Sequence, residues 1–449
     1  MGQGRGKKDG AAQDRARTAF VIHVAPKKRG AEDGRDSADR LEEAVGLTAA
    51  IGLQVIATRI APLARPVPGT LIGSGKVEEI AAEARDLEPE VIVVNAQLSP
   101  VQQRNLEKAW NAKVLDRTAL ILEIFGERAQ TREGRLQVEL AHLTYQRSRL
   151  VRTWTHLERQ RGGFGFLGGP GETQIETDRR LIGERIAKIK RELEEVKRTR
   201  GLHRTARKRV PYPVVALVGY TNAGKSTLFN NLTKSGVLAK DLLFATLDPT
   251  MRALKLPGRR QVILSDTVGF IADLPVELVA AFRATLEEVL EADVIAHVRD
   301  ASHEETDAQK GDVLKVLAEL GIDPEGERPI VEILNKIDLL EPSIGKSLVA
   351  RNSPVGPIAI SALTGEGLPD LLARFEKVLG AAETVLNLKL SSSDGAGLAW
   401  IYEHARVLKR ADRGDGVRLT VAVDPQLIDR FRERFKADVL EEQDVPRAS

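Results

Sequence analysis

The octapeptide GYTNAGKS at residues 219–226 directly follows a five-residue apolar run, VVALV at residues 214–218. The apolar run predicts a buried strand, so the chain passes from a strand into a loop with two glycines. Such a loop turns consecutive backbone N–H groups toward phosphate oxygens, while Lys225 neutralises phosphate charge and Ser226 offers a hydroxyl to Mg²⁺. The loop therefore predicts a site for a nucleoside triphosphate. The expected contacts are Gly219, Tyr220, Thr221, Asn222, Ala223, Gly224, Lys225, Ser226 and Thr227.

Two segments downstream offer further groups for the phosphates and a metal ion. FATLDPT at 244–250 supplies the Thr246 hydroxyl, and DTVG at 266–269 follows an apolar strand predicted at 262–264. A carboxylate at a strand end can hold Mg²⁺ through water, and the Gly269 N–H can bond the γ-phosphate. Loss of that phosphate would release both segments, which makes them candidate switches. The alternative for Asp266 is a plain turn residue. The expected metal ligands are Ser226 and Thr246, and the residues expected to act in hydrolysis are Lys225, Thr246 and Gly269. The expected nucleotide contacts in these two segments are Phe244, Ala245, Thr246, Leu247, Asp248, Asp266, Thr267, Val268 and Gly269.

The motif NKID at residues 335–338 predicts which base is bound. It stands at the end of an apolar strand predicted at 331–334. The Asp338 carboxylate can accept bonds from N1–H and N2–H of guanine, and adenine lacks this pair of donors, so the motif favours GTP over ATP. Asn335 would brace the loop and bond the N7 edge, and the stem of Lys336 can lie along the ring. Ser361, Ala362 and Leu363, at another strand end, would approach the guanine O6.

The residue after Gly269 has a consequence for turnover. Many GTPases place there a glutamine that orients the attacking water, and here the residue is Phe270. A phenylalanine has no group for this task, so we expect slow unaided hydrolysis that a group from another domain or a partner accelerates. The alternative is that Phe270 packs in the core and another residue of the same domain orients the water.

Composition limits the class of protein. A chain of 449 residues exceeds one hydrophobic core, and 42% hydrophobic residues suit a globular protein. The sequence has no long apolar segment, so we expect neither a membrane span nor a secretory signal. The absence of cysteine excludes disulfides and thiolate metal sites, and it fits a reducing cytoplasm. We expect a multidomain α/β chain with these parts: a disordered basic tail (1–17), an N-terminal α/β domain (18–130), a helical hairpin with a glycine-rich loop (131–209), a GTPase domain with a mostly parallel sheet (210–380) and a small α/β C-terminal domain (381–449).

The expected elements of the two flanking domains follow from short apolar runs and helical periodicity. In the N-terminal domain, strands are predicted at 20–24, 54–58 and 91–94, and helices at 38–50, 77–84 and 101–110. In the C-terminal domain, strands are predicted at 385–390 and 418–423, and helices at 398–408 and 425–435.

The predicted hairpin carries uneven charge. One helix over 132–161 has a leucine stripe, and a second carries Ile182, Ile186, Ile189, Leu193 and Val196 in a 4-3-4-3 spacing, so the two can pack as an antiparallel pair. Residues 179–209 hold 13 Lys and Arg against 4 Asp and Glu, a net +9 in a chain of net +3. Such a block is either a solvated helix face or a surface for a polyanion. The loop at 162–171, with Phe164 and Phe166, is a candidate exposed tip, or merely a flexible turn whose phenylalanines dock elsewhere.

Together these motifs resemble the HflX family of ribosome-associated GTPases, in the Obg-HflX superfamily, over about residues 41–379. The nucleotide motifs look like that family's versions. More specific are segments that nucleotide binding does not require: LIGSGKVEEI at 71–80, LSPVQQRNLE at 98–107, the stretch DRTALILEIFGERAQTREGRLQVELAHLTY at 116–145 and GGPGETQIETDRR at 168–180. The loop GGFGFLG before GGPGETQ departs from the small, basic form common in the family.

The resemblance implies a cytoplasmic GTPase that binds the large ribosomal subunit and its rRNA in the GTP state, uses Mg²⁺, and is a monomer when free. It also implies splitting or rescue of stalled or stress-damaged ribosomes, with hydrolysis stimulated by the ribosome.

Three alternatives remain at this stage. One is a ribosome-assembly factor that uses the nucleotide as a switch, and another is an RNA-remodelling protein with a separate ATP site. For the latter, GSGK at 73–76 is too short for a phosphate loop and reads better as a turn before a helix. The third, a small-molecule kinase on a phosphate-loop fold, would leave the guanine motif without a role.

Overall fold

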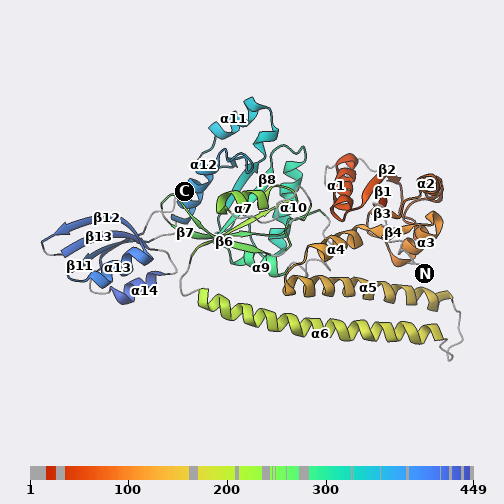
Figure 1. Cartoon of the computed structure of the whole chain (residues 1–449), viewed down its shortest axis with the longest axis horizontal. Coiled ribbons are helices and arrows are strands. Elements are labelled where there is room, and N and C mark those ends of the chain that lie inside the picture. The colour runs from red at the N-terminus through yellow and green to blue at the C-terminus, as the bar shows by residue number, and fades with distance from the viewer. Residues whose placement is uncertain are drawn as a thin grey trace, which may run out of the picture. The chain divides into compact units, whose positions relative to one another are not determined.

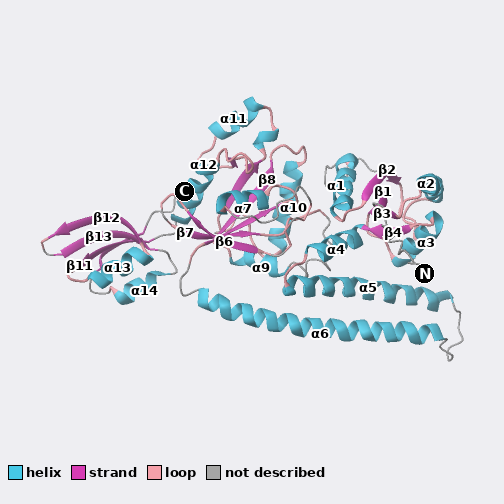
Figure 2. Ribbon diagram, in the orientation of Figure 1, coloured by secondary structure: helices cyan, strands magenta, loops and turns pink. Residues whose placement is uncertain are grey.

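The computed structural model describes most of the chain, coloured by residue number in Figure 1. Contacts divide the chain into two compact units, one of Met1–Glu127 with His142–Glu184 and the other of Arg128–Ala141 with Arg185–Ser449. Both contain helices and strands (Figure 2), so the α/β prediction is confirmed. The five-part division at the boundaries above stays a prediction. The described residues are 17–26, 36–160, 170–207, 212–234, 243–244, 246–247, 249–258, 260–272, 283–324, 326, 328–353, 355–380, 384–414, 416–423, 427–435 and 439–444.

Four parallel strands form the sheet of the first unit, in the order β2-β1-β3-β4. β3 is buried along its whole length because helices cover both faces of a parallel sheet. Six predicted elements are present, and the sequence reading missed β4 and α4. The GSGK segment was expected to be a turn before a helix; instead Gly73 is the N-cap and residues 74–76 form the first turn of α2. The elements are β1 (Thr18–Pro26), α1 (Ser37–Ala50), β2 (Gln54–Leu63), α2 (Ser74–Leu87), β3 (Val91–Asn95), α3 (Pro100–Trp110), β4 (Lys113–Asp116) and α4 (Arg117–Arg128).

The two long helices of the predicted hairpin are α5 (Arg132–Gln160) and α6 (Pro170–Arg207). Within the second unit they run antiparallel, because Arg185 Nε lies 2.7 Å from Glu139 Oε1 and Arg132 lies 3.9 Å from Glu192. Leu136, Val138, Ala141, Ile186, Ile189 and Leu193 are buried. Pro170 and Gly171, expected in the loop, instead begin α6, a position where proline needs no partner for its missing N–H. Phe164 and Phe166 lie outside the described residues.

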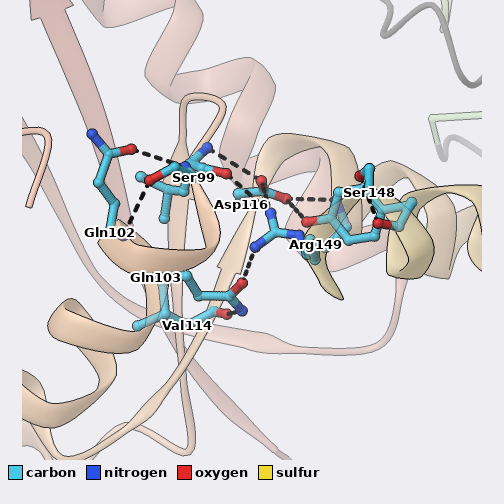
Figure 3. Close-up of polar contacts among 10 residues, drawn as sticks. Ser99, Gln102, Gln103, Val114, Asp116, Ser148 and Arg149 are labelled. Carbon is cyan, nitrogen blue, oxygen red and sulfur yellow. Dashed lines mark hydrogen bonds and ion pairs between the residues drawn. The ribbon is translucent and has the colours of Figure 1, made fainter. Parts of the chain in front are cut away.

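In the first unit, α5 is fixed to the sheet through the buried carboxylate of Asp116 (Figure 3). Its Oδ2 accepts bonds from Arg149 Nη2 at 2.6 Å and Leu98 N at 3.2 Å, and its Oδ1 from Tyr145 OH at 2.7 Å and Ala119 N at 2.8 Å. Arg149 also bonds Gln103, and burial together with the Asp116 charge raises the pKa of Tyr145. Four donors on one carboxylate compensate the cost of burying its charge.

A six-stranded sheet forms the centre of the second unit, in the order β10-β9-β8-β5-β7-β6. All neighbours are parallel except β6 and β7, so the prediction of a mostly parallel sheet is confirmed. The ends of β5, β7, β8 and β9 therefore meet at one edge, where ligands bind in open α/β sheets. The elements are β5 (Val214–Gly219), α7 (Lys225–Thr233), β6 (Thr250–Lys255), β7 (Gln261–Asp266), α9 (Arg283–Glu291), β8 (Val294–Asp300), α10 (Thr306–Glu319), β9 (Ile330–Asn335), the 3₁₀ turn η1 (Ile337–Leu339), α11 (Pro342–Ala350), β10 (Ile358–Ala359) and α12 (Leu368–Gly380).

The C-terminal part contains an antiparallel sheet in the order β12-β13-β11-β14, with a core shared by two helices. The predicted helix over 398–408 is wrong at its end. α13 stops at His404, Ala405 is extended, and the residues from Arg406 form strand β12, because pairing with β13 outweighs the helical spacing of the leucines. Of the predicted helix 425–435, residues 425 and 426 lie outside the described part. The elements are β11 (Thr384–Leu390), α13 (Gly395–His404), β12 (Arg406–Arg413), β13 (Gly416–Val423), α14 (Ile428–Arg434) and β14 (Val439–Asp444). No helix in the described ranges is long and apolar enough to span a membrane.

Candidate nucleotide-binding site

The loop between β5 and α7 is shaped by residues with positive φ. Asn222 has φ of 60° and Gly224 of 90°. A Cβ on Gly224 would overlap the Asn335 side-chain nitrogen, so both the dihedral and the close approach require glycine there. The loop thus turns tightly into the first turn of α7, where unpaired N–H groups favour an anion.

Lys225 is buried at the start of α7, with 6% of its surface exposed. Its Nζ donates to the carbonyl oxygens of Gly219 at 3.0 Å and Tyr220 at 2.7 Å. Burial lowers the pKa of Lys225 to about 8, and the nearby charge of Asp266 opposes that shift. The lysine is therefore held inside the curve of the loop, beside the place where phosphate would enter.

Three oxygen atoms meet beside Lys225. Ser226 Oγ lies 2.8 Å from Thr246 Oγ1, and both hydroxyls donate to Asp266 Oδ2, at 2.7 and 2.9 Å. Burial raises the pKa of Asp266, while the two hydroxyls and Lys225 oppose the shift. Oxygen-only donor sets suit Mg²⁺, so these three residues fit that ion. Among the described residues, no group of three or more His, Asp or Glu side chains offers a second metal site.

The segment after β7 lies directly against the phosphate loop. Phe270 N donates to Gly219 O at 3.0 Å, and Thr221 N donates to Phe270 O at 2.8 Å. A Cβ on Gly269 would lie 2.8 Å from Thr221 Cα and 3.1 Å from Lys225 Nζ, so only glycine fits. The Phe270 side chain is buried, at 3% exposure. The ring therefore packs inside the domain, as the alternative reading of Phe270 expects; that another residue of the domain orients the water stays a prediction.

The loops that contain residues 335–338 and 361–363, predicted to contact guanine, are bound to each other and to the phosphate loop. Asn335 Nδ2 donates to Ala223 O at 2.8 Å, and Asn335 Oδ1 accepts from Ala362 N at 2.8 Å. Asp338 is exposed, and its Oδ1 accepts the Ser361 hydroxyl at 2.6 Å. Asn335 thus connects two loops, and Asp338 is exposed and held in place by the Ser361 hydroxyl, as a contact to a base would require.

The remaining expected residues differ in where their side chains lie. Thr267 donates its hydroxyl to Leu217 O at 2.6 Å, inside the sheet, and Tyr220 OH accepts from Ala272 N. Phe244, Leu247 and Val268 are buried, Thr227 is half-buried and Leu363 is 74% exposed. Ala245 and Asp248 lie outside the described residues.

Two residues of the site escaped the sequence reading. Asn231 of α7 donates to Ala362 O at 3.0 Å, and Asp300 lies 2.8 Å from the Lys336 ammonium. Asp300 ends a buried strand, as Asp266 does, so its position was a usable signal. Asn231 had no such signal, because only the fold brings its helix to residue 362.

Three features lie at one edge of the sheet: a strand that runs into a phosphate loop, a hydroxyl–carboxylate group and an Asn-Lys-x-Asp loop. Together they define the class of phosphate-loop GTPases. Family comparisons cover nearly the whole chain. Residues 38–126 match "GTP-binding GTPase N-terminal", 128–207 "GTP-binding GTPase Middle Region", 214–336 "50S ribosome-binding GTPase" and 349–436 "HflX C-terminal domain". The chain is 52% identical to GTPase HflX of Magnetococcus marinus, over 92% of this chain and 94% of that one.

GTPase HflX of Escherichia coli is 42% identical over 84% of this chain and 87% of its own length. A crystal structure of a GTP-binding protein of Sulfolobus solfataricus in complex with GDP has 27% identity and a TM-score of 0.43, covering 81% of this chain and 98% of that one. The chain belongs to the HflX family of GTPases and is a GTP hydrolase.

Proposed function

We propose that the protein is a Mg²⁺-dependent GTPase that binds the large ribosomal subunit in the GTP state and splits or rescues stalled or stress-damaged ribosomes. The match of residues 214–336 to a family described as 50S ribosome-binding GTPases supports the partner. The main structural support for nucleotide and Mg²⁺ binding is that the hydroxyls of Ser226 and Thr246 both donate to Asp266, beside the buried Lys225.

Lys225 and the loop N–H groups would stabilise the charge that builds on the phosphates as water attacks in line. Ser226 and Thr246 would hold Mg²⁺, with Asp266 behind them through water, and the ion would supply positive charge to the β- and γ-phosphates. The Gly269 N–H would bond the γ-phosphate, so phosphate loss frees the segments of Thr246 and Gly269.

Hydrolysis in this arrangement depends on a partner. The buried Phe270 ring offers no group to orient water, and a missing group supplied by a partner is worth about 10³ to 10⁵ in rate. The exposed basic side chains of α6 are suited to rRNA phosphates. Both features are consistent with turnover that the ribosome stimulates. The proposal also includes a cytoplasmic location and a monomeric state of the free protein.

The test is sedimentation of the purified protein with ribosomes in GDP and in a non-hydrolysable GTP analogue, with turnover measured with and without ribosomes. We expect co-sedimentation with the analogue, appearance of free subunits and a large rise in turnover. The ribosomal proposal fails if neither binding nor turnover responds. RNA-stimulated ATP turnover that survives Lys225→Ala would instead favour an RNA-remodelling protein.

A further inference from the structure

Asp300, the last residue of β8, divides its carboxylate between two neighbours. Oδ2 lies 2.8 Å from the ammonium of Lys336. Oδ1 accepts from Ser302 N at 3.0 Å and from Ser302 Oγ at 2.6 Å. The Asp300 side chain is 12% exposed and that of Lys336 is 21% exposed. A largely desolvated ion pair of this kind is held in one geometry, unlike an exposed lysine pair.

The backbone fixes Asp300 relative to the base-recognition loop. Asp300 and Asn335 are Cα partners in the pairing of β8 and β9. Just beyond them, Ala301 N donates to Asn335 O at 2.8 Å. Lys336 follows with φ of 64°, a conformation that is uncommon for residues other than glycine. The carboxylate and the lysine are thus placed by the same ladder that positions Asn335.

The pairing decides which part of Lys336 is available to a nucleotide. Its ammonium is neutralised by Asp300, so the residue offers its methylene stem and not a free charge. A free lysine stem samples many rotamers, and an ammonium held at its end removes that freedom before any ligand arrives.

We propose that Asp300 is a positioning residue of the nucleotide site, which anchors the Lys336 ammonium so that the lysine stem forms a fixed apolar ledge for the guanine ring. This inference rests on the proposed GTPase function and on the predicted contact of Asn335, Lys336 and Asp338 with guanine. It differs from a purely structural role, in which Asp300 only stabilises the turn at Ser302.

The test is a double-mutant cycle on GDP affinity with Asp300→Ala, Lys336→Ala and the double variant. Each single change should weaken GDP binding about 3- to 10-fold, and the double variant should bind no more weakly than the worse single. The KM for GTP should rise equally, while turnover at saturating GTP stays within about twofold. Unchanged singles, or effects that multiply in the double variant, would overturn the inference.

Two control variants isolate the lysine contact. Ser302→Ala removes only the Oγ bond to Asp300, and Asp307→Ala removes a carboxylate paired with Arg299, the residue that precedes Asp300 in β8. Both should leave GDP affinity unchanged, and a Ser302→Ala loss equal to that of Asp300→Ala would assign Asp300 to the turn. If Asp300→Ala fails to fold, Asp300→Asn, which can still accept from Ser302, takes its place in the cycle.

Asp338→Ala in the same assay distinguishes a failure of the proposed ledge from a failure of the guanine site itself. If Asp338→Ala weakens GDP binding and Asp300→Ala does not, the ledge fails and the guanine site stands. If neither variant responds, the guanine site itself is misplaced and the ledge fails with it.

Discussion

Ser226, Thr246 and Asp266 combine two hydroxyls and one carboxylate next to a buried ammonium, and each group depends on the others. Asp266 is buried at 0% exposure, where an unpaired charge is costly, and the two hydroxyls and Lys225 compensate it. The hydrogen bond from Thr246 to Asp266 therefore keeps the two side chains together even before a metal ion binds. The residues that would grip Mg²⁺ hold one another in position.

Lys225 gives the site a pH dependence. Its pKa of about 8 in the free protein means that it loses its proton above that pH, whereas bound phosphates favour the protonated form. GDP affinity should be flat below about pH 8 and fall by up to about tenfold per unit above it. Titrations between about pH 7 and about pH 9 measure this. Lys225→Arg is the control, because a guanidinium stays charged; identical profiles for the two proteins would contradict the assignment.

Asp338 should set base preference. Asp338→Asn replaces one acceptor by a donor, so it loses a bond to guanine and gains one to the extra carbonyl of xanthine. We expect GDP to bind at least about tenfold more weakly and XDP more tightly, measured by competition for one fluorescent nucleotide. Asp370→Asn, at an aspartate on α12 that bonds Asn352, is the matched control. An unchanged preference in Asp338→Asn would remove the base assignment.

Among the elements, α5 depends on Asp116 for its position on the first unit. The helix presents Tyr145 and Arg149, one turn apart, and the Arg149 guanidinium lies 4.3 Å from the Tyr145 ring centroid. Both side chains then reach the same carboxylate at the end of β4. A strand end that in other α/β sheets binds a ligand is here filled by the protein's own helix.

Removing this arginine should loosen α5 locally. Arg149→Ala leaves Asp116 buried without its cation and should cost about 2 kcal/mol, because three other donors remain. Amide hydrogen exchange in α5 after residue 142 should become about 30-fold faster, with α7 unchanged. Arg147→Ala, at an exposed position of the same helix, should have no effect. Equal exchange in both variants would show that the ion pair does not hold the helix.

Sequence patterns predicted elements well where local signals agreed, and less well where distant pairing decided. The run at 214–218 identified β5 and the phosphate loop because strand and motif are adjacent in the chain. By contrast, the first three residues of β12 were predicted as the end of a helix, since the partner strand β13 lies beyond them in the chain and the spacing of Leu398, Ile401 and Leu408 also fits a helix. Asn231 was missed for the same reason, because only the fold brings its helix to residue 362, whereas Asp300 ends a buried strand and could have been predicted from that position.

Across the whole molecule, positive charge is concentrated in one segment. Residues 179–209, all but the last two of which belong to α6, carry a net +9 in a chain of net +3, so the rest of the protein has a net charge of −6. In α6 the buried stripe of Ile186, Ile189 and Leu193 faces inward, and Lys188, Lys190 and Arg191 are exposed. The helix thus separates a packing face from a charged face, as expected of a scaffold that also binds a polyanion.

Replacing Lys188, Lys190 and Arg191 together by alanine should weaken binding to the large ribosomal subunit without altering GDP affinity. Each side chain that contacts a phosphate contributes about one unit to the slope of log affinity against log salt, so the slope should fall by up to about three. Sedimentation at several salt concentrations measures it. Replacing the exposed acidic pair Glu194 and Glu195 of the same helix by alanine is the control, and it should preserve or strengthen binding. If the basic triple variant retains the slope of the unaltered protein, the charged face of α6 is only solvated, and the ribosome must be contacted by another surface.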